Sequence, residues 1–174
     1  MGNWFNIDAM DLQDARNVIN FHYWARNRML EALEQLSQDQ FTQELGGSFG
    51  SVRNTIVHTL SAECVWLARW RGESPSGMLA PDGYADLASV RRAWTDNEAK
   101  LRQLFEPLDE AGIQKVIPYK TLAGVESASP LWQMLQHVVN HASYHRGQVT
   151  TLLRQLGAAP PKSTDLITFY RENP

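Results

Sequence analysis

The feature that most constrains the fold is a long amphipathic run from Leu131 to Leu156. On a helical wheel with about 100° per residue, the apolar side chains of this run fall in one sector. The sector contains Leu131, Leu135, Val138, Ala142, Val149, Leu153 and Leu156, with Met134 and Leu152 at its edge. This stripe predicts one helix of about seven turns, which must bury its apolar face against other helices.

Three earlier segments show the same helical period. The first runs from about Asp11 to Leu36, the second from Ser48 or Ser51 to about Arg71, and the third from about Asp86 to Phe105 or Glu106. Residues that typically start or stop a helix mark the ends of these segments. Gly72 follows the second segment and Pro107 follows the third. For the last helix we expect Ser129 as the cap, Pro130 at the first helical position and Gly157 beyond the end.

Residues 116–127 separate the third and last helices and are too short for further helices. They are predicted to form a small hairpin or an extended cover. The expected fold is therefore all-α: a four-helix bundle with this insertion before its last helix. A chain of 174 residues with 43% hydrophobic content can bury one substantial core, so a single domain spanning residues 1–174 is expected.

Charge and hydropathy exclude several classes of partner. The net charge is −3 and the arginines are scattered, so nucleic acid is not an expected partner. No stretch approaches 18 apolar residues and the N-terminus lacks a secretory signal pattern, which predicts a soluble cytoplasmic protein without a membrane partner. The single cysteine, Cys64, cannot form an internal disulfide, in agreement with a reducing compartment.

Two of the five histidines, His141 and His145, lie four residues apart on one face of the last helix. Both fall at the border of the apolar sector, where they would face inward. His58 in the second helix is a third candidate ligand, because its neighbours on the wheel are mostly small or polar while the large apolar groups lie elsewhere. The neighbouring strip consists of Ser51, Asn54, Thr55, Ser61, Ala62 and Val65. This pattern predicts a site for a divalent metal ion on His58, His141 and His145.

Three imidazoles leave at least one coordination position for water or substrate, which is typical of a catalytic metal site. Imidazole accepts zinc, nickel, iron and copper, and zinc or nickel is the expected cofactor. The ion would activate water, as in a hydrolase, or a low-molecular-weight thiol, as in an S-transferase, with a small molecule as the substrate. The sequence identifies no catalytic base. The alternative is a non-catalytic, stress-associated protein that binds the metal or a small ligand.

Other polar residues have simpler interpretations. His137 is expected near the mouth of the site or in a hydrogen bond to a ligand, and His22 in a packing or surface role. Glu63 and Cys64 do not fall on the face of His58, so neither is expected to be a ligand. Ala142 follows the first histidine of the pair, which excludes the zinc-protease motif H-E-x-x-H.

Four more residues near the histidine pair have expected roles. Arg146 is expected in a buried ion pair or in hydrogen bonds to a neighbouring loop. Gly147, inside the helix, is expected where another chain segment approaches closely. Tyr144 and Gln148 are polar neighbours that could contact a ligand or a partner subunit.

Two strings give the chain a resemblance to a known family. Residues 140–148 read N-H-x-x-Y-H-R-G-Q, and residues 46–51 read G-G-S-F-G-S, seven residues before His58. With the Pro160-Pro161 pair in the tail, they resemble the DinB-like (DinB/YfiT-like) family of metal-dependent enzymes. The resemblance covers nearly the whole chain and is loosest in the first helix, where Arg26 replaces the asparagine of a W-A-N pattern.

The resemblance implies an up-down-down-up bundle, frequently a homodimer, with a divalent ion on three histidines that match His58, His141 and His145. Some relatives are transferases or isomerases that use bacillithiol or mycothiol. The dimer contact is expected on the first and second helices.

Overall fold

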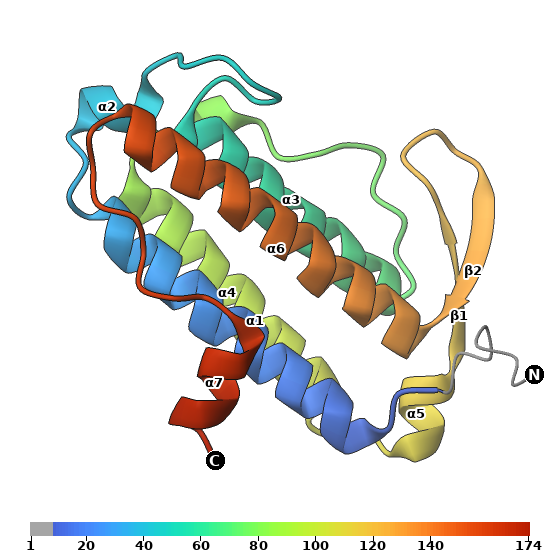
Figure 1. Ribbon diagram of the computed structural model, residues 1–174. Helices are drawn as coiled ribbons and strands as arrows, with labels where there is room; N and C mark the ends of the chain where they lie inside the picture. Colours follow the sequence, from blue (N-terminus) through green and yellow to red (C-terminus); the bar gives the residue numbers. More distant parts are fainter. Residues whose placement is uncertain (1–8) are drawn as a thin grey trace, which may run out of the picture.

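The computed structural model describes residues 9–174, and four long helices dominate it (Figure 1). They are α1 (Leu12–Leu33), α3 (Val52–Trp70), α4 (Leu87–Phe105) and α6 (Leu131–Gln155). Shorter elements connect or follow them: α2 (Gln38–Thr42), η1 (Pro81–Gly83), α5 (Glu110–Gln114), β1 (Val116–Lys120), β2 (Glu126–Pro130) and α7 (Leu166–Glu172). None of the helices in this part of the chain is both long enough and apolar enough to cross a bilayer.

The four long helices form the predicted bundle with an up-down-down-up arrangement. In Figure 1, α1 and α6 run toward the end that carries α2, whereas α3 and α4 both run away from it. Because α3 and α4 point the same way, residues 71–86 must return along the length of the bundle between them (Figure 1). Helix α6 packs against both α3 and α1, and α3 packs in turn against α4.

The ends of the long helices follow from side-chain caps and glycines. Ser51 begins α3 by accepting a hydrogen bond from the backbone N–H of Asn54 at 3.1 Å. Asp86 does the same for α4 through Ser89. At the other ends, Gly72 and Gly157 have φ angles of 84° and 71°, a left-handed conformation that glycine adopts without strain.

Some predicted boundaries differ from the structure. Ser129 does not cap α6, because it pairs with Ile117 in the hairpin, and Pro130 occupies the cap position instead of the first helical one. Helix α1 ends at Leu33, three residues earlier than expected. The short helices α2, α5 and α7 were not predicted, since their five to seven residues are too few to show a helical period.

The predicted hairpin is present as β1 and β2, which pair antiparallel with Tyr119 opposite Ser127. It lies at the end of the bundle where α3 ends and α6 begins (Figure 1). The backbone N–H of Leu131 donates to the carbonyl of Lys115 at 3.0 Å, which joins the base of the hairpin to the start of α6. The strand β1 also contacts α3, so the hairpin covers one end of the α3–α6 pair.

The core contains two apolar clusters with a polar layer between them. One cluster includes Leu67 and Leu135 toward the hairpin, and the other includes Leu60 and Val149 toward α2. Between Leu60 and Leu67, α3 carries Glu63, whose side chain is 1% exposed. Burying a carboxylate costs a large free energy unless its oxygens are hydrogen-bonded, so its partners decide whether this layer is stable.

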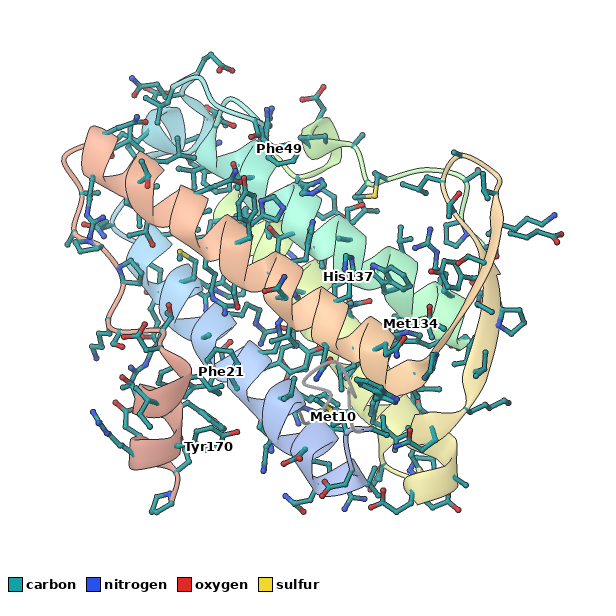
Figure 2. The ribbon with its side chains drawn as sticks, turned by 45° about the vertical axis from the view of Figure 1, so that its right-hand side comes forward. Met10, Phe21, Phe49, Met134, His137 and Tyr170 are labelled. Carbon is teal, nitrogen blue, oxygen red and sulfur yellow. The ribbon has the colours of Figure 1, made fainter. Side chains whose placement is uncertain are left out.

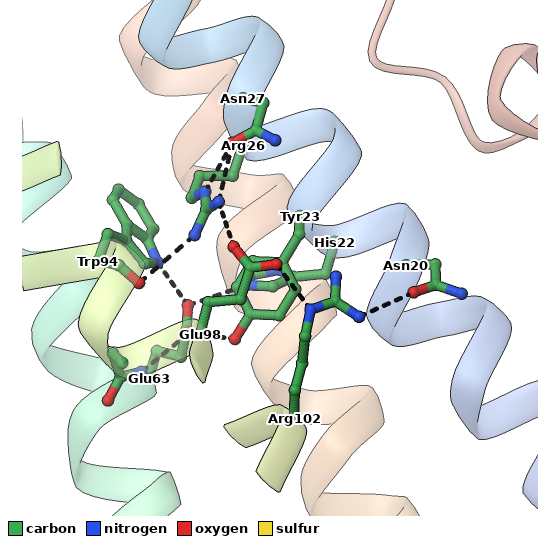
Figure 3. Close-up of polar contacts among 10 residues, drawn as sticks. Asn20, His22, Tyr23, Arg26, Asn27, Glu63, Trp94, Glu98 and Arg102 are labelled. Atoms are coloured by element: carbon green, nitrogen blue, oxygen red, sulfur yellow. Dashed lines mark hydrogen bonds and ion pairs between the residues drawn. The ribbon is translucent and has the colours of Figure 1, made fainter. Parts of the chain in front are cut away.

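The carboxylate of Glu63 accepts hydrogen bonds from four side chains on α1 and α4 (Figure 3). These donors are His22 at 2.9 Å and Trp94 at 2.6 Å on one oxygen, and Tyr23 at 2.7 Å and Asn97 at 2.9 Å on the other. Burial alone would raise the pKa of Glu63, but the charge of His22 and these hydrogen bonds lower it. The layer therefore holds an ionised carboxylate and joins three helices.

Candidate metal centre

The structure brings the three histidines predicted from the sequence together between α3 and α6. The Nε2 atoms of His58 and His141 are 3.2 Å apart, and those of His141 and His145 are 3.0 Å apart. One ligand nitrogen from each residue lies within 4.8 Å of the others, and these three form the metal-type cluster found within residues 9–174. Two helices that are distant in sequence, α3 and α6, thus contribute histidines to one cluster.

The spacing of these nitrogens fits a metal ion. With zinc–nitrogen bonds of 2.0–2.1 Å, a tetrahedral site places its ligand nitrogens about 3.3 Å apart. The observed separations of 3.0 and 3.2 Å are within a few tenths of an ångström of this value. Helix geometry explains the match on α6, since residues four apart are stacked on one face. The donor set of three imidazoles suits a borderline divalent ion better than Mg²⁺ or Ca²⁺.

A hydrogen bond orients His145. Its Nδ1 lies 2.7 Å from Oε1 of Gln148, one turn later in α6. An amide oxygen can only accept a hydrogen bond, so the proton of the neutral ring belongs on Nδ1 and the lone pair of Nε2 faces His141 and His58. The His145 side chain is also buried, at 5% exposure, which restricts its ring to this orientation.

Phe49 packs over the cluster from the loop that precedes α3. Its ring is stacked on His58 with centroids 4.1 Å apart, and it meets His145 edge-on at 5.4 Å. The amide of Asn54 donates to the Phe49 carbonyl at 3.0 Å, which fixes the loop at this place. Phe49 lies in the G-G-S-F-G-S string but its contact with the histidines was not predicted. In the sequence, only the glycines on either side of this aromatic residue could have indicated that the loop brings it close to the site.

The pKa values of His58 and His141 favour the neutral form of imidazole that a metal requires. Burial, followed by the neighbouring His145, lowers the pKa of His58. Burial and three nearby histidines lower the pKa of His141 to about 4. Metal ions compete with protons for imidazole nitrogens, so these lowered pKa values favour metal binding at neutral pH.

His137 lies at the mouth of the cluster and outside it, in agreement with its expected place. Its ring centre is 6.0 Å from that of His141 and 5.1 Å from that of Trp66. Figure 2 shows Phe49 and His137 along the seam between α3 and α6. The seam is partly exposed at His58, Trp66 and His141, so the cluster faces solvent on this side.

The other titratable residues that were considered do not join the cluster. His22 is buried against Glu63, which is the packing role that was expected, and Glu63 itself belongs to the polar layer. Burial raises the pKa of the Cys64 thiol to about 12, so this residue offers neither a thiolate ligand nor a nucleophile at neutral pH. Tyr144 is 65% exposed beside His145 and remains free to contact a ligand.

Two predictions about the neighbours of the histidines were wrong. Arg146 forms no ion pair within residues 9–174; its Nη2 donates to Ser143 of the same helix at 2.6 Å, and its guanidinium lies over Phe21 of α1. Gly147 has no close neighbour within residues 9–174, since a Cβ atom there would meet none of their atoms within 4 Å. It lines an open groove of about 790 Å³ beside α1.

Comparisons with known proteins agree with the fold and with the resemblance seen in the sequence. The family model described as "DinB family" matches residues 11–172. Protein DinB of Bacillus subtilis is 28% identical over 167 residues, covering 89% of this chain and 94% of its own length.

Two solved structures share the fold. YfiT from Bacillus subtilis, described as a probable metal-dependent hydrolase with an unusual four-helix bundle topology, aligns with a TM-score of 0.69 and 14% identity over 91% of this chain and 97% of its own. A DinB-like protein from Bacillus cereus aligns with a TM-score of 0.65 and 16% identity over 84% of this chain and 95% of its own. The family match spans nearly the whole chain, and we conclude that this protein belongs to the DinB family.

Proposed function

We propose that this protein is a divalent-metal-dependent enzyme whose ion is held by His58, His141 and His145. The convergence of their three Nε2 atoms, with successive separations of 3.2 and 3.0 Å, is the observation that carries the proposal. Zinc or nickel is the ion that best suits three neutral imidazoles at this spacing. The description of YfiT as a probable metal-dependent hydrolase supports the same kind of chemistry.

The surroundings favour a catalytic site over a purely structural one. Structural zinc sites are closed by four protein ligands, whereas this cluster offers three within the described residues. His58 and His141 are partly exposed on the seam, so a small molecule can approach from that side. Phe49 covers one face of the His58 ring and limits the access of water to that face.

The protein's own residues have separate roles in this proposal. Gln148 holds the Nδ1 proton of His145 and so directs its Nε2 lone pair to the ion. The lowered pKa values of His58 and His141 keep both rings unprotonated. A bound ion would supply Lewis-acid chemistry, lowering the pKa of water or of a small thiol. Water as the nucleophile gives a hydrolase, and a thiol gives an S-transferase.

The first experiment is elemental analysis of untagged protein, comparing wild type with His58→Ala and His145→Ala. His137→Ala is the matched control, because this ring lies 6.0 Å from His141 but outside the cluster. We expect near-stoichiometric metal in wild type and in the control, and its loss from the two cluster variants. Wild-type protein that stays metal-free after reconstitution, or cluster variants that retain full metal, would contradict the proposal.

The reaction class requires a second measurement. Metal-loaded wild type is assayed with ester and amide substrates for hydrolysis, and with electrophiles plus a small thiol for transfer. Turnover in one series, absent from His145→Ala, would assign the class. Stoichiometric metal without turnover in either series would favour the alternative of a non-catalytic binding protein.

A further inference from the structure

Arg69 is a buried cation with no acidic partner among the residues that the structure describes. It lies in the last turn of α3 and is 5% exposed. Its guanidinium forms no ion pair or hydrogen bond within residues 9–174, and its Nε is buried without a partner. Burying a charge without compensation is costly, so the position of this guanidinium requires an explanation.

Aromatic rings hold the guanidinium in place. Its central carbon lies 4.5 Å from the ring centre of Trp66 and 4.9 Å from that of Tyr119 on β1. The two rings meet edge-on at 5.2 Å. Cation–π contacts of this kind stabilise the charge through its flat face. No described residue pairs with the N–H donors at the edge of the guanidinium, and these are the groups with which arginine binds carboxylates and phosphates.

Arg69 belongs to the same strip of α3 as the metal cluster. His58, Ala62, Trp66 and Arg69 follow at intervals of four, four and three residues, which places them on one helix face. Across the seam, the rings of Trp66, His137 and His141 form a continuous row, with centres 5.1 and 6.0 Å apart. The row leads from the guanidinium to the three-histidine cluster.

We propose that Arg69 binds an anionic group, a carboxylate or phosphate, of an elongated substrate whose reacting end lies at the three-histidine cluster. This inference rests on the proposed function and specifies its substrate class. The body of the substrate lies along Trp66 and His137, where aromatic surfaces offer apolar contact. Burial and the nearby Arg69 lower the pKa of His137, so this ring stays neutral beside the substrate.

The helix sets the length of such a substrate. Eleven residues separate His58 from Arg69, which corresponds to about 16 Å along the axis of α3. The guanidinium lies over the ring of Trp66, eight residues or about 12 Å along the axis from His58. The anionic group and the reacting atom are therefore on the order of 10–15 Å apart. Short anions cannot span both sites.

A structural role for Arg69 is the competing explanation, since its contact with Tyr119 also fastens the hairpin to α3. The two explanations differ in what they predict for ligands. A fastening role affects charged and neutral ligands equally. A binding role favours a ligand with a terminal anion over a neutral ligand of the same length.

The test uses full-length protein loaded with Co²⁺, whose absorption changes when a thiolate binds. The probes are mercaptoundecanoate, mercaptoundecanol of the same length, and the short mercaptoacetate. We expect wild type to bind the long acid about tenfold to a hundredfold more tightly than the long alcohol. Arg69→Met should remove this preference while the affinity for the alcohol stays unchanged. Arg71→Met, at an exposed arginine two residues later, should retain the preference.

The outcomes separate this inference from the proposed function. Equal affinity of wild type for the long acid and alcohol would overturn the role of Arg69, whether or not Arg69→Met folds. A preference that survives in Arg69→Met would overturn it as well. Failure of the protein to bind Co²⁺ would instead contradict the proposed function, and this inference with it. Bound Co²⁺ whose spectrum no long thiol changes would overturn this inference alone. Mercaptoundecylphosphonate, compared with the long acid, tells which anion is preferred.

Discussion

The Nδ1 atom of His145 lies 2.7 Å from Oε1 of Gln148, so a residue outside the cluster sets the tautomer of one of its rings. Replacing the amide by an apolar group in Gln148→Leu removes this acceptor. Residues that hold a metal ligand in this way typically change metal affinity by 10–100-fold. We expect a loss of about that size in Gln148→Leu, measured by competition with a chromogenic chelator.

The matched control is Gln148→Glu, which keeps an acceptor oxygen at nearly the same position. It should retain most of the wild-type affinity, because a carboxylate also accepts from the Nδ1 proton. Equal affinities in wild type and Gln148→Leu would show that packing alone orients His145.

The metal-free protein should lose stability in mild acid. The pKa of His141 is lowered from 6.5 to about 4 by burial and by its histidine neighbours. The unfolded chain, with the ordinary pKa, binds more protons between these two values, so the free energy of unfolding falls as the pH drops through this window. Urea unfolding curves of metal-free protein at a series of pH values measure the slope.

In His141→Asn the slope over the same pH range should be smaller, since the titrating group is gone. The pKa of His58 is also lowered, so part of the slope should persist. An unchanged slope in His141→Asn would mean that other groups cause the acid sensitivity.

The polar layer around Glu63 should be costly to disturb. Glu63→Gln replaces one acceptor oxygen by an N–H donor and leaves two of the four donors facing it without a partner. Breaking a buried, hydrogen-bonded charge typically costs about 3–5 kcal/mol, and we expect a loss of that order in urea unfolding. Glu126→Gln is the control, because Glu126 pairs with Lys120 on the surface at 3.9 Å. It should change stability by less than about 0.5 kcal/mol; similar values for the two variants would refute the role of the layer.

Gly147 should be replaceable with a gain in stability. A Cβ atom at this position would meet none of the described residues within 4 Å, and the residue lies inside α6. Gly147→Ala should therefore stabilise the protein by about 0.5–1 kcal/mol, the difference in helix propensity. Gly50→Ala is the opposite case, because the φ of Gly50 is 78°, which strains alanine, and an added Cβ atom would also meet the Glu44 carboxylate. A thermal scan in which both variants shift the same way would contradict this account.

The helical period was sufficient to predict the long helices, because each hides one face and ends at a cap, glycine or proline. The capping box of Ser37 and Gln40 was also present in the sequence, but α2 has too few residues for a period to confirm it. The start of α6 was misplaced since Ser129 is a good cap by type. Its pairing in the hairpin depends on a strand that is not adjacent in sequence.

The site was partly predictable for the same reason. His141 and His145 are neighbours on one helix, so spacing alone brings them together, and His58 was indicated by the small residues around it. The partners of Glu63 are 31 to 41 residues away in sequence, and only tertiary packing reveals them. Arg69 likewise gives no local signal, because Tyr119 comes from the hairpin.

Residues 71–86 return along the bundle between α3 and α4. If the chain were cut there, metal binding would show whether the two fragments associate again. This connection contains exposed residues such as Gly77, where a cut would leave α1 and α3 on one fragment and α4 and α6 on the other. His58 would lie on the first fragment, and His141 and His145 on the second. Neither fragment holds all three ligands, so full metal coordination would appear only when the two halves associate.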